Sequence, residues 1–439
     1  MPRYVLIGNS AGGIAAAEAI REVDREGSIC IISDEPYPAY SRPLISEFLA
    51  GERTLEGMLY RSAAFYQQNS IEALLGRRVV SVNFPDRRVV LEGGESLSWE
   101  RLLLATGGVP VVPNIAGREK EGVRTFTTLQ DAKSIERFLE GKPRVVVIGG
   151  GLIGLSLTSA LVKRGLSVVM VELLNRVLSA ILDEPASRLV ERVLREAGVQ
   201  LITGQTVREI VGKPDDEGRV GGVVLDSGRQ LPCEMVVIAI GVTPRTELVR
   251  NSPVKVSRGI VVDRHMATSY PHVYACGDVA EGYDFVYETD RLTPIWPNAY
   301  LGGRVAGYNM AGKRTQYPGG TAANSLKYFG YPLVSAGMVN PQDGCEVLAF
   351  TRDQVYRKVV LRDDHIVGLL FAGDIQKAGV VFGLMRERVN VRPFKDALVR
   401  DDFGLAFLPE GQRWAKLGRP PALKALREES AREDLPMGE

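Results

Sequence analysis

Two glycine-rich turns contain the residues whose types and spacing most clearly imply chemistry in this 439-residue chain. The first turn follows the apolar residues 4–7 and contains Gly8, Ser10, Ala11 and Gly13. A glycine turn that leads from a strand into a helix leaves backbone N–H groups free. These groups and the helix dipole together hold a pyrophosphate. The turn therefore predicts a dinucleotide site near the N-terminus.

Ser10 stands where the second glycine of the usual pattern would be. It narrows the approach of a phosphate but offers a hydroxyl donor in exchange. A second apolar strand, residues 29–32, ends at Asp34 and Glu35, and an acid at about this spacing binds ribose hydroxyls. For this turn alone, a strand–turn–helix that binds nothing remains an open alternative.

The second turn matches the pattern more completely. After the apolar residues 144–148 come Gly149, Gly151, Leu152, Ile153 and Gly154. A strand over 167–171 then ends at Glu172, whose carboxylate would accept both ribose hydroxyls and repel a 2′-phosphate. NAD(H) is therefore favoured over NADP(H), although the nearby Arg176 moderates this preference. Two such turns predict two bound dinucleotides or a duplicated βαβ module.

The elements that position these turns alternate between strands and helices, as in an α/β protein. The length predicts about three domains. Lys and Arg (54) nearly balance Asp and Glu (53), so global charge gives no indication of nucleic-acid binding. No apolar run reaches the roughly 18 residues of a membrane span. Residues 1–7 lead into a strand without a signal-peptide pattern, so we expect a cytoplasmic protein.

Cysteine and histidine usage argues against two further kinds of site. The four cysteines are widely spaced and form no Cys-x-x-Cys pair: Cys30, Cys233, Cys276 and Cys345. We expect them to be small buried apolar residues. With only three histidines in the chain, a metal site or a histidine-based catalytic triad is disfavoured.

Further segments resemble those of the pyridine nucleotide–disulfide oxidoreductases, and they occur in the family's order. Residues 102–108 resemble the Ala-Thr-Gly segment that ends the first FAD stretch. Residues 237–244 resemble the segment that leaves the NAD domain, and residues 259–280 resemble the second FAD segment. Coincidence of all these motifs in one order is very improbable.

The resemblance implies an α/β fold with two Rossmann-like nucleotide-binding domains of the three-layer ββα type. The FAD domain is split by the inserted NAD domain, and a C-terminal α+β interface domain follows. The expected boundaries are 1–112 and 250–319 for the two parts of the FAD domain, 113–249 for the NAD(H) domain, 320–410 for the interface domain and 411–439 for a charged tail.

The resemblance also assigns residues to each cofactor. Those implied for FAD are Gly8, Ser10, Ala11, Gly13, Asp34, Glu35, Arg42, Pro43, Ala105, Thr106, Gly107, Gly277, Asp278, Pro297, Asn298 and Ala299. Those implied for NAD(H) are Gly149, Gly151, Leu152, Ile153, Gly154, Glu172 and Gly241. In the family, the aspartate at position 278 holds the ribityl and phosphate region of the flavin. We expect residues 297–299 to precede a helix over 300–310 and to aim N–H groups at the flavin's pyrimidine edge.

One departure from the family bears on the chemistry. Disulfide reductases of the family carry a flavin-facing cysteine within the stretch that corresponds to residues 38–51, and this chain has none there. Without a thiolate beside the flavin there is no thiol relay. The stretch resembles the rubredoxin-, ferredoxin- and nitrite-reductase branch, and the chain is also similar to NADH-handling flavoprotein subunits. Glu47 and Ser156 stand where many relatives carry a Lys–Glu pair near the flavin.

The implied reaction is hydride transfer between nicotinamide C4 and flavin N5, with the rings about 3–3.5 Å apart. The cofactors carry the chemistry and the protein orients them, so no side chain is assigned as catalytic. Gly241 would let the nicotinamide approach, and Ile153 would lie near the ring stack. For Trp296 and Tyr40, packing around the cofactor is favoured over a role in electron transfer.

Without a thiol, electrons would pass directly to an iron–sulfur protein such as ferredoxin or rubredoxin, or to a partner subunit. A basic surface could steer an acidic partner, although a solvated face with scattered charges is the favoured interpretation. The basic residues considered are Arg386, Arg388, Arg392, Lys395, Arg400, Arg413, Lys416, Arg419, Lys424 and Arg427.

Three other functions stay open at this stage. The nearest is an NADH oxidase that reduces oxygen. A non-catalytic flavin-binding scaffold is a second alternative. A membrane quinone reductase is a third, disfavoured because residues 413–427 offer few apolar anchors. We expect a homodimer or a subunit of a larger complex.

Overall fold

The computed structural model describes residues 3–141, 143–341, 343–411 and 413. The chain forms two compact units, the first ending at Gly337 and the second beginning at Met338. Most of the expected charged tail therefore lies outside the described residues. So do four of the basic residues considered above: Lys416, Arg419, Lys424 and Arg427.

The first sheet holds the N-terminal glycine turn. Its five parallel strands run in the order β19-β7-β1-β2-β3. They are β1 (Tyr4–Ile7), β2 (Ile29–Ser33), β3 (Ile71–Leu75), β7 (Arg101–Leu104) and β19 (Val273–Ala275). All four residues of β1 are buried, because this central strand has neighbours on both sides and is covered on both faces.

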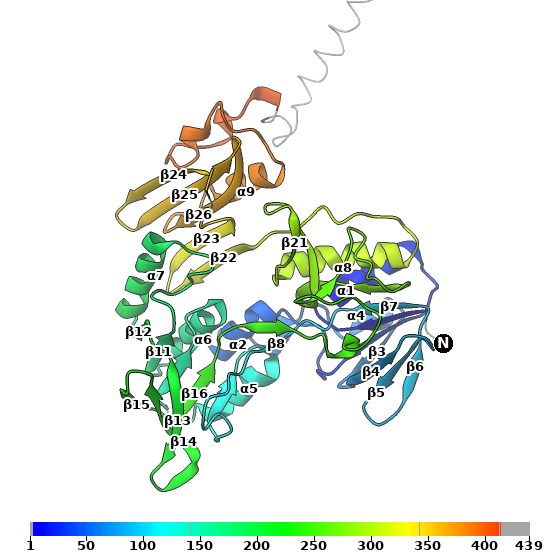
Figure 1. Cartoon of the computed structure of the whole chain (residues 1–439), viewed down its shortest axis with the longest axis horizontal. Helices are drawn as coiled ribbons and strands as arrows, with labels where there is room; N and C mark the ends of the chain where they lie inside the picture. The colour runs from blue at the N-terminus through cyan, green and yellow to red at the C-terminus, as the bar shows by residue number, and fades with distance from the viewer. Residues whose placement is uncertain (1–2, 142, 342, 412, 414–439) are drawn as a thin grey trace, which may run out of the picture. The chain divides into compact units, whose positions relative to one another are not determined.

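Two layers cover this sheet (Figure 1). One consists of the helices α1 (Ala11–Val23) and α8 (Trp296–Met310), which approach each other closely. A Cβ atom at Gly303 would lie 2.2 Å from the carbonyl oxygen of Gly12. The other layer is the antiparallel sheet of β4 (Val79–Asn83), β5 (Arg88–Leu91) and β6 (Ser96–Ser98). This confirms the three-layer ββα arrangement.

The second sheet repeats this design around the second glycine turn. Its parallel strands run in the order β12-β11-β10-β16-β9. They are β9 (Val123–Thr125), β10 (Val145–Ile148), β11 (Val168–Glu172), β12 (Gln200–Thr203) and β16 (Met235–Ile238). The associated helices are α5 (Leu129–Phe138), α6 (Leu152–Lys163) and α7 (Glu184–Glu196). An antiparallel sheet comprises β13 (Val207–Lys213), β14 (Asp216–Leu225) and β15 (Gln230–Pro232).

Two short antiparallel strands connect the sheets. β8 (Gly108–Pro110) leads out of the first sheet, and β17 (Val242–Pro244) leads back toward it. After this return, β19 joins the first sheet beside β7. The second nucleotide-binding fold is therefore inserted into the first, as the family resemblance implies.

The cysteine-free stretch forms short helices: η1 (Arg42–Leu44), α2 (Ile45–Leu49) and α3 (Leu55–Met58), followed by α4 (Ala64–Gln68). Ile45 and Leu49 of α2 share one hydrophobic cluster with Leu129 of α5 and Leu157 of α6. This part of the N-terminal segment thus packs on the helices of the inserted fold.

After β19 the chain forms η3 (Gly277–Val279), β20 (Ala280–Asp284) and β21 (Thr289–Leu292). β20 also pairs with the short β18 (Ile260–Val261), which follows η2 (Glu247–Val249). Beyond α8, the strands β22 (Ala323–Tyr328) and β23 (Tyr331–Gly337) form a hairpin. Its loop consists only of Phe329 and Gly330, which both have positive φ, as a tight two-residue turn requires.

The second unit contains an antiparallel meander of β24 (Glu346–Arg352), β25 (Val355–Arg362) and β26 (His365–Ala372). α9 (Ala378–Arg386), η4 (Lys395–Ala397) and η5 (Leu405–Phe407) follow. The fully buried Arg357 forms ion pairs with Asp374 (2.6 Å) and Asp401 (2.9 Å). A buried guanidinium requires such partners.

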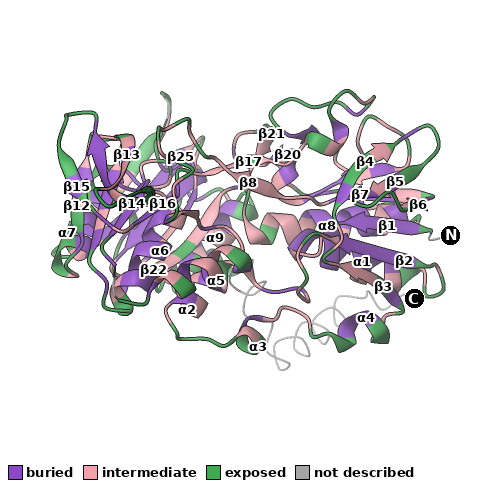
Figure 2. Ribbon diagram, turned by 90° about the horizontal axis from the view of Figure 1, so that it is seen from below, coloured by how far each residue is buried: buried purple, intermediate pink, exposed green. Residues whose placement is uncertain are grey.

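Burial follows the layers in both folds: the central strands are buried and the loops around them are exposed (Figure 2). Three of the four cysteines are buried as expected, and Cys345 is partly exposed. Burial raises the pKa of Cys30, Cys233 and Cys276 to about 12, so these thiols stay protonated and inert. None of the helices in the described ranges is both long enough and apolar enough to cross a bilayer.

Candidate dinucleotide sites

The first glycine turn is tight because its glycines contact backbone directly. Gly8 has φ +126°, and a Cβ atom there would lie 2.1 Å from the carbonyl oxygen of Ala105. A Cβ atom at Gly13 would lie 1.9 Å from the carbonyl oxygen of Gly8. α1 starts at Ala11, and its N-cap residue Ser10 makes no side-chain capping bond. The first N–H groups of α1 are therefore free of a side-chain cap and available to a phosphate.

The two acids at the end of β2 point to different partners. Asp34 forms an ion pair with Arg245 at 2.7 Å. Glu35 accepts a hydrogen bond from the hydroxyl of Tyr40 at 2.6 Å and forms an ion pair with Arg42. Glu35 is thus the better-placed acceptor for a ribose beside the glycine turn, whereas Asp34 ties down the segment after β17.

Arg42 and Asp278 lie within electrostatic reach of each other. Both side chains are partly exposed. Desolvation raises the pKa of Asp278, and the positive charge of Arg42 counteracts this rise. Arg42 also donates to the carbonyl oxygen of Thr127 at 3.1 Å. Pro43 fixes the start of the 3-10 turn that presents Arg42.

The segment at residues 105–107 and the start of α8 lie beside the first glycine turn and Gly277, respectively. Thr106 donates to the carbonyl oxygen of Arg245 at 2.8 Å, and Gly107 has φ +70°. α8 begins at Trp296, so residues 297–299 form its first turn instead of preceding it, which corrects the expected helix start. Its N-cap residue makes no side-chain capping bond, and proline stands in this first turn. The side chain of Asn298 is occupied by the carbonyl oxygens of Thr293 and Thr321.

These features fit FAD along its whole length. Free helix N–H groups suit the diphosphate, Glu35 suits the adenosine ribose, and Asp278 suits the ribityl hydroxyls. The positive charge of Arg42 lies within electrostatic reach of both carboxylates, and a diphosphate would provide its counter-charge. The first turn of α8, opposite Gly277, can donate to the pyrimidine edge of a flavin.

The second glycine turn combines tight packing with open space. A Cβ atom at Gly149 would lie 2.5 Å from the carbonyl oxygen of Ala239, and one at Gly154 would lie 2.0 Å from that of Gly149. In contrast, a Cβ atom at Gly151 or Gly241 would meet nothing within 4 Å. α6 begins at Leu152, directly after Gly151. The space beside this turn is therefore free for a ligand.

Glu172 is held in place at the end of β11. Its carboxylate accepts hydrogen bonds from the backbone N–H groups of Gly150 at 2.5 Å and Leu174 at 2.7 Å. A carboxylate fixed in this way still has lone pairs for both ribose hydroxyls. Arg176 is partly exposed, and its Nε atom has no hydrogen-bond partner among the described residues. These contacts fit NAD(H).

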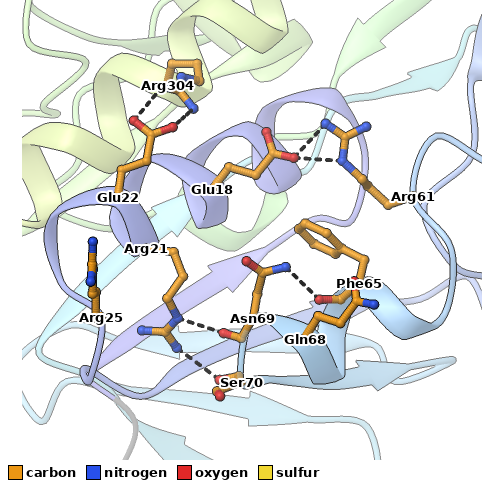
Figure 3. Close-up of a pocket in the computed structure, with 10 residues that line it drawn as sticks. All are labelled: Glu18, Arg21, Glu22, Arg25, Arg61, Phe65, Gln68, Asn69, Ser70 and Arg304. Carbon is orange, nitrogen blue, oxygen red and sulfur yellow. Dashed lines mark hydrogen bonds and ion pairs between the residues drawn. The ribbon is translucent and has the colours of Figure 1, made fainter.

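An aromatic pair and a charged pocket lie outside both glycine turns, and the sequence alone did not predict them. Tyr60 and Trp296 form an edge-to-face pair with ring centroids 5.2 Å apart, and the guanidinium of Arg61 lies 4.2 Å from the Tyr60 ring centroid. Next to them is an open pocket formed by α1, α4, α8 and the loop before α4 (Figure 3). Its charged residues are Arg21, Arg25, Arg61, Arg304, Glu18 and Glu22. They come from three separate segments, so no single motif could reveal them.

Charges in this pocket are partly paired. Arg61 binds Glu18 at 2.6 Å, and Arg304 binds Glu22 at 2.7 Å. Arg21 instead donates to backbone carbonyl oxygens, including that of Asn69 at 2.7 Å. Arg25 is exposed and forms no ion pair within the described ranges. Four arginines against two glutamates leave the pocket positive.

The expected C-terminal basic surface is less distinct. Lys395 is paired with Glu346 at 2.7 Å, and Arg400 with Asp402 at 2.7 Å. Both lie in the second unit. These pairs favour the interpretation of a solvated, charge-balanced face for this part of the stretch.

Comparison with known proteins gives consistent matches. Residues 2–303 match the model of the pyridine nucleotide-disulphide oxidoreductases, and residues 323–389 match that of the rubredoxin NAD+ reductase C-terminal domain. The chain is 31% identical to nitrite reductase [NAD(P)H] of Bacillus subtilis over 89% of its own length. It spans only 48% of that relative.

Two further matches cover nearly whole chains. The NADH-dependent phenylglyoxylate dehydrogenase subunit epsilon of Aromatoleum evansii is 28% identical, over 94% of this chain and 98% of the relative. In the covalent putidaredoxin reductase–putidaredoxin complex, the matching chain superposes with a TM-score of 0.84 at 26% identity. This match covers 95% of the present chain and 99% of the other.

Proposed function

The chain belongs to the pyridine nucleotide–disulphide oxidoreductase family, and we propose that it oxidises NADH and passes the electrons through FAD to an iron–sulfur protein. It is an oxidoreductase that binds FAD and NAD(H), as the family does. The identity of the electron acceptor is the part of this proposal that goes beyond the family. This acceptor is inferred mainly from one observation: the residues that suit FAD are present, but residues 38–51, the stretch that would carry a thiol, contain no cysteine.

We assign FAD to the site at the first glycine turn and NADH to the site at the second. Glu35, Arg42 and Asp278 would hold the adenosine ribose, the diphosphate and the ribityl chain. Glu172 would orient the adenosine ribose of NADH. When bound, FAD supplies two-electron uptake from a nicotinamide and one-electron release to an acceptor. The residues around it bind, orient and exclude water.

NADH is proposed over NADPH because of the electrostatics at Glu172. Its carboxylate is fixed by two backbone N–H groups. A 2′-phosphate would bring a second negative charge next to this carboxylate, which would repel it. The effect should be large enough to distinguish the two nucleotides in steady-state kinetics.

The positive pocket beside Tyr60 and Trp296 is the proposed docking surface for the acceptor (Figure 3). Trp296 is the first residue of α8, the helix whose first turn is assigned to the flavin, and Arg304 of the pocket lies on the same helix. Its excess of arginine suits a partner with an acidic face. The match to a reductase bound to its protein acceptor supports a partner of this class.

The test is anaerobic stopped-flow of the flavin-loaded protein, reduced with NADH and then mixed with oxidised ferredoxin or with oxygen. Rapid reoxidation by ferredoxin and slow reoxidation by oxygen is the expected result. Rapid reaction with oxygen and none with ferredoxin would instead identify an NADH oxidase. Absence of reduction by NADH despite bound FAD would identify a scaffold.

A further inference from the structure

A tyrosine hydroxyl joins an acid of the first nucleotide site to the inserted fold. The hydroxyl of Tyr40 donates to the carboxylate of Glu35 at 2.6 Å and accepts a hydrogen bond from the backbone N–H of Leu129 at 3.0 Å. Glu35 follows β2 of the first sheet, whereas Leu129 is the first residue of α5 in the inserted fold. The two nucleotide-binding folds are therefore linked through one side chain.

The link uses a backbone group that α5 cannot satisfy itself. The first N–H groups of a helix have no acceptor within the helix. In α5, Thr128 and Asp131 form a capping box that satisfies the N–H groups of these two residues. The N–H of Leu129 is bound by Tyr40 instead. The carboxylate of Glu35 lies behind this hydroxyl, where a negative charge stabilises the positive end of the helix dipole.

The side chain of Tyr40 is held rigidly by its surroundings. It is only 5% exposed and belongs to the same hydrophobic cluster as Leu129 and Leu49. α2, which contains Leu49, packs against α5, as Figure 2 shows. Burial raises the pKa of Tyr40, so its hydroxyl stays protonated and continues to donate to Glu35.

Contacts continue from α5 to the strand that leads to Gly241. The carboxylate of Asp131, in the first turn of α5, accepts a hydrogen bond from the hydroxyl of Thr125 at 3.3 Å. Thr125 is the last residue of β9 and pairs with Ile238, the last residue of β16. Gly241, where the nicotinamide is proposed to approach, follows three residues later. A shift at the start of α5 would therefore be felt close to Gly241.

We propose that Tyr40 positions the inserted fold relative to the FAD site and so sets the approach of the nicotinamide to the flavin. This inference rests on the proposed FAD and NADH sites. Tyr40 acts through Glu35 on one side and through α5 on the other, and it is given no contact with the reacting atoms. It is therefore a positioning residue.

Loss of the hydroxyl should affect the rate of hydride transfer more than the affinity for NADH. The buried N–H of Leu129 would lose its acceptor, so the first turn of α5 would have to move to find another. Hydride transfer requires the two rings at about 3–3.5 Å, and small displacements lower its rate steeply. NADH would still bind at the second glycine turn and Glu172, which the change does not touch.

The test is anaerobic stopped-flow reduction of the FAD-loaded protein by NADH at several concentrations, for the wild type and Tyr40→Phe. The substitution keeps the ring in the hydrophobic cluster and removes only the hydroxyl. We expect the limiting rate of flavin reduction to fall about three- to tenfold, and the dissociation constant for NADH to stay within about twofold of the wild type. Reduction by dithionite, which does not use the NADH site, should keep the wild-type rate.

Tyr37→Phe is the matched control. Tyr37 lies on the same loop, and its hydroxyl also reaches α5, where it donates to Gln130 at 3.3 Å. This contact is at the surface, and no hydrogen bond joins Tyr37 to Glu35 in the part of the chain that the structure describes. Its flavin should be reduced at the wild-type rate. FAD content and the unfolding temperature show whether each variant is folded.

Amide exchange at the start of α5 gives a second readout that requires no reduction. With FAD in excess, residues 129–131 should exchange faster in Tyr40→Phe than in the wild type or in Tyr37→Phe. Unchanged exchange there would overturn the proposal.

Two kinetic results would also overturn it: a wild-type limiting rate in folded, FAD-loaded Tyr40→Phe, or an equal loss of rate in Tyr37→Phe. Absence of flavin reduction by NADH in the wild type would instead contradict the proposed function, and amide exchange would still decide the role of Tyr40.

Discussion

The two glycine turns share a design but differ in how far the protein closes around them. At the first turn, Gly8 is pressed against Ala105, and Arg42 lies within electrostatic reach of the desolvated carboxyl of Asp278. At the second turn, Gly151 and Gly241 open onto free space. The carboxylate of Glu172 there accepts hydrogen bonds from two backbone N–H groups. An enclosed site suits a resident cofactor, and an open site suits a nucleotide that enters and leaves at each turnover.

The largest expected difference comes from adding one methyl group to each turn. Gly8→Ala places a Cβ atom 2.1 Å from a backbone oxygen at φ +126°, so the backbone must shift. We expect loss of bound FAD and of stable folding, measured by flavin absorbance and thermal unfolding.

Gly151→Ala is the contrasting change in the second turn, at the position that Ser10 holds in the first, whereas Gly149, like Gly8, packs tightly. The Cβ atom added at residue 151 would meet nothing within 4 Å, so FAD content and the unfolding temperature should stay near the wild-type values while the KM for NADH rises. If both variants lost FAD, the two turns would not differ as described.

Next in size is the effect of Arg42→Met on FAD. The substitution removes the cation that pairs with Glu35 and lies within electrostatic reach of Asp278. Hydrogen bonds to charged groups are worth about 1.5–3 kcal/mol, which corresponds to roughly 10–100-fold in FAD affinity. Equilibrium binding to the apoprotein measures this change.

Arg53→Met is the control for Arg42→Met, because Arg53 lies in the same segment but pairs with Glu47 at the surface. It should retain wild-type FAD affinity. Full FAD affinity in Arg42→Met as well would remove Arg42 from the proposed diphosphate site.

A smaller effect is expected for Glu172→Gln, and only at the second turn. Removing the negative charge should raise the KM for NADH by about tenfold. It should also reduce the preference for NADH over NADPH, because a 2′-phosphate is no longer repelled. FAD content should not change. Glu184→Gln, which removes an exposed carboxylate from α7, serves as the control. An unchanged ratio of NADH to NADPH efficiency would contradict the assignment of Glu172.

The smallest effect concerns the positive pocket. Arg25→Gln should lower the rate of reoxidation by ferredoxin by about two- to threefold at low ionic strength, and the difference should vanish at high salt. The matched control is Arg314→Gln, which removes an exposed arginine outside the pocket. Equal effects of both substitutions would indicate a general charge effect and no specific docking surface.

Local pattern was sufficient to predict both turns and the acids that follow them. Strand, glycine and acid lie within about thirty residues in each case, so sequence spacing directly reflects geometry. α8 begins earlier than the sequence predicts, because Pro297 lies within the first turn of the helix and does not precede it. Proline fits the first helical turn, where its missing N–H is not needed.

Contacts between distant segments could not be predicted in this way. Nothing near Tyr40 in the sequence indicates that its hydroxyl accepts a hydrogen bond from Leu129, since the two are brought together only by the packing of α2 on α5. The same is true of the contact between Arg42 and the carbonyl oxygen of Thr127. Long-range packing, and not local propensity, determines these positions.

Anaerobic titration of the FAD-loaded protein with NADH tests the central claim most directly, namely that FAD is the only two-electron acceptor in the chain. The account predicts that one equivalent of NADH per FAD bleaches the flavin completely, because no redox-active thiol pair accepts further electrons. A requirement for two equivalents would reveal a second two-electron acceptor and would contradict the account.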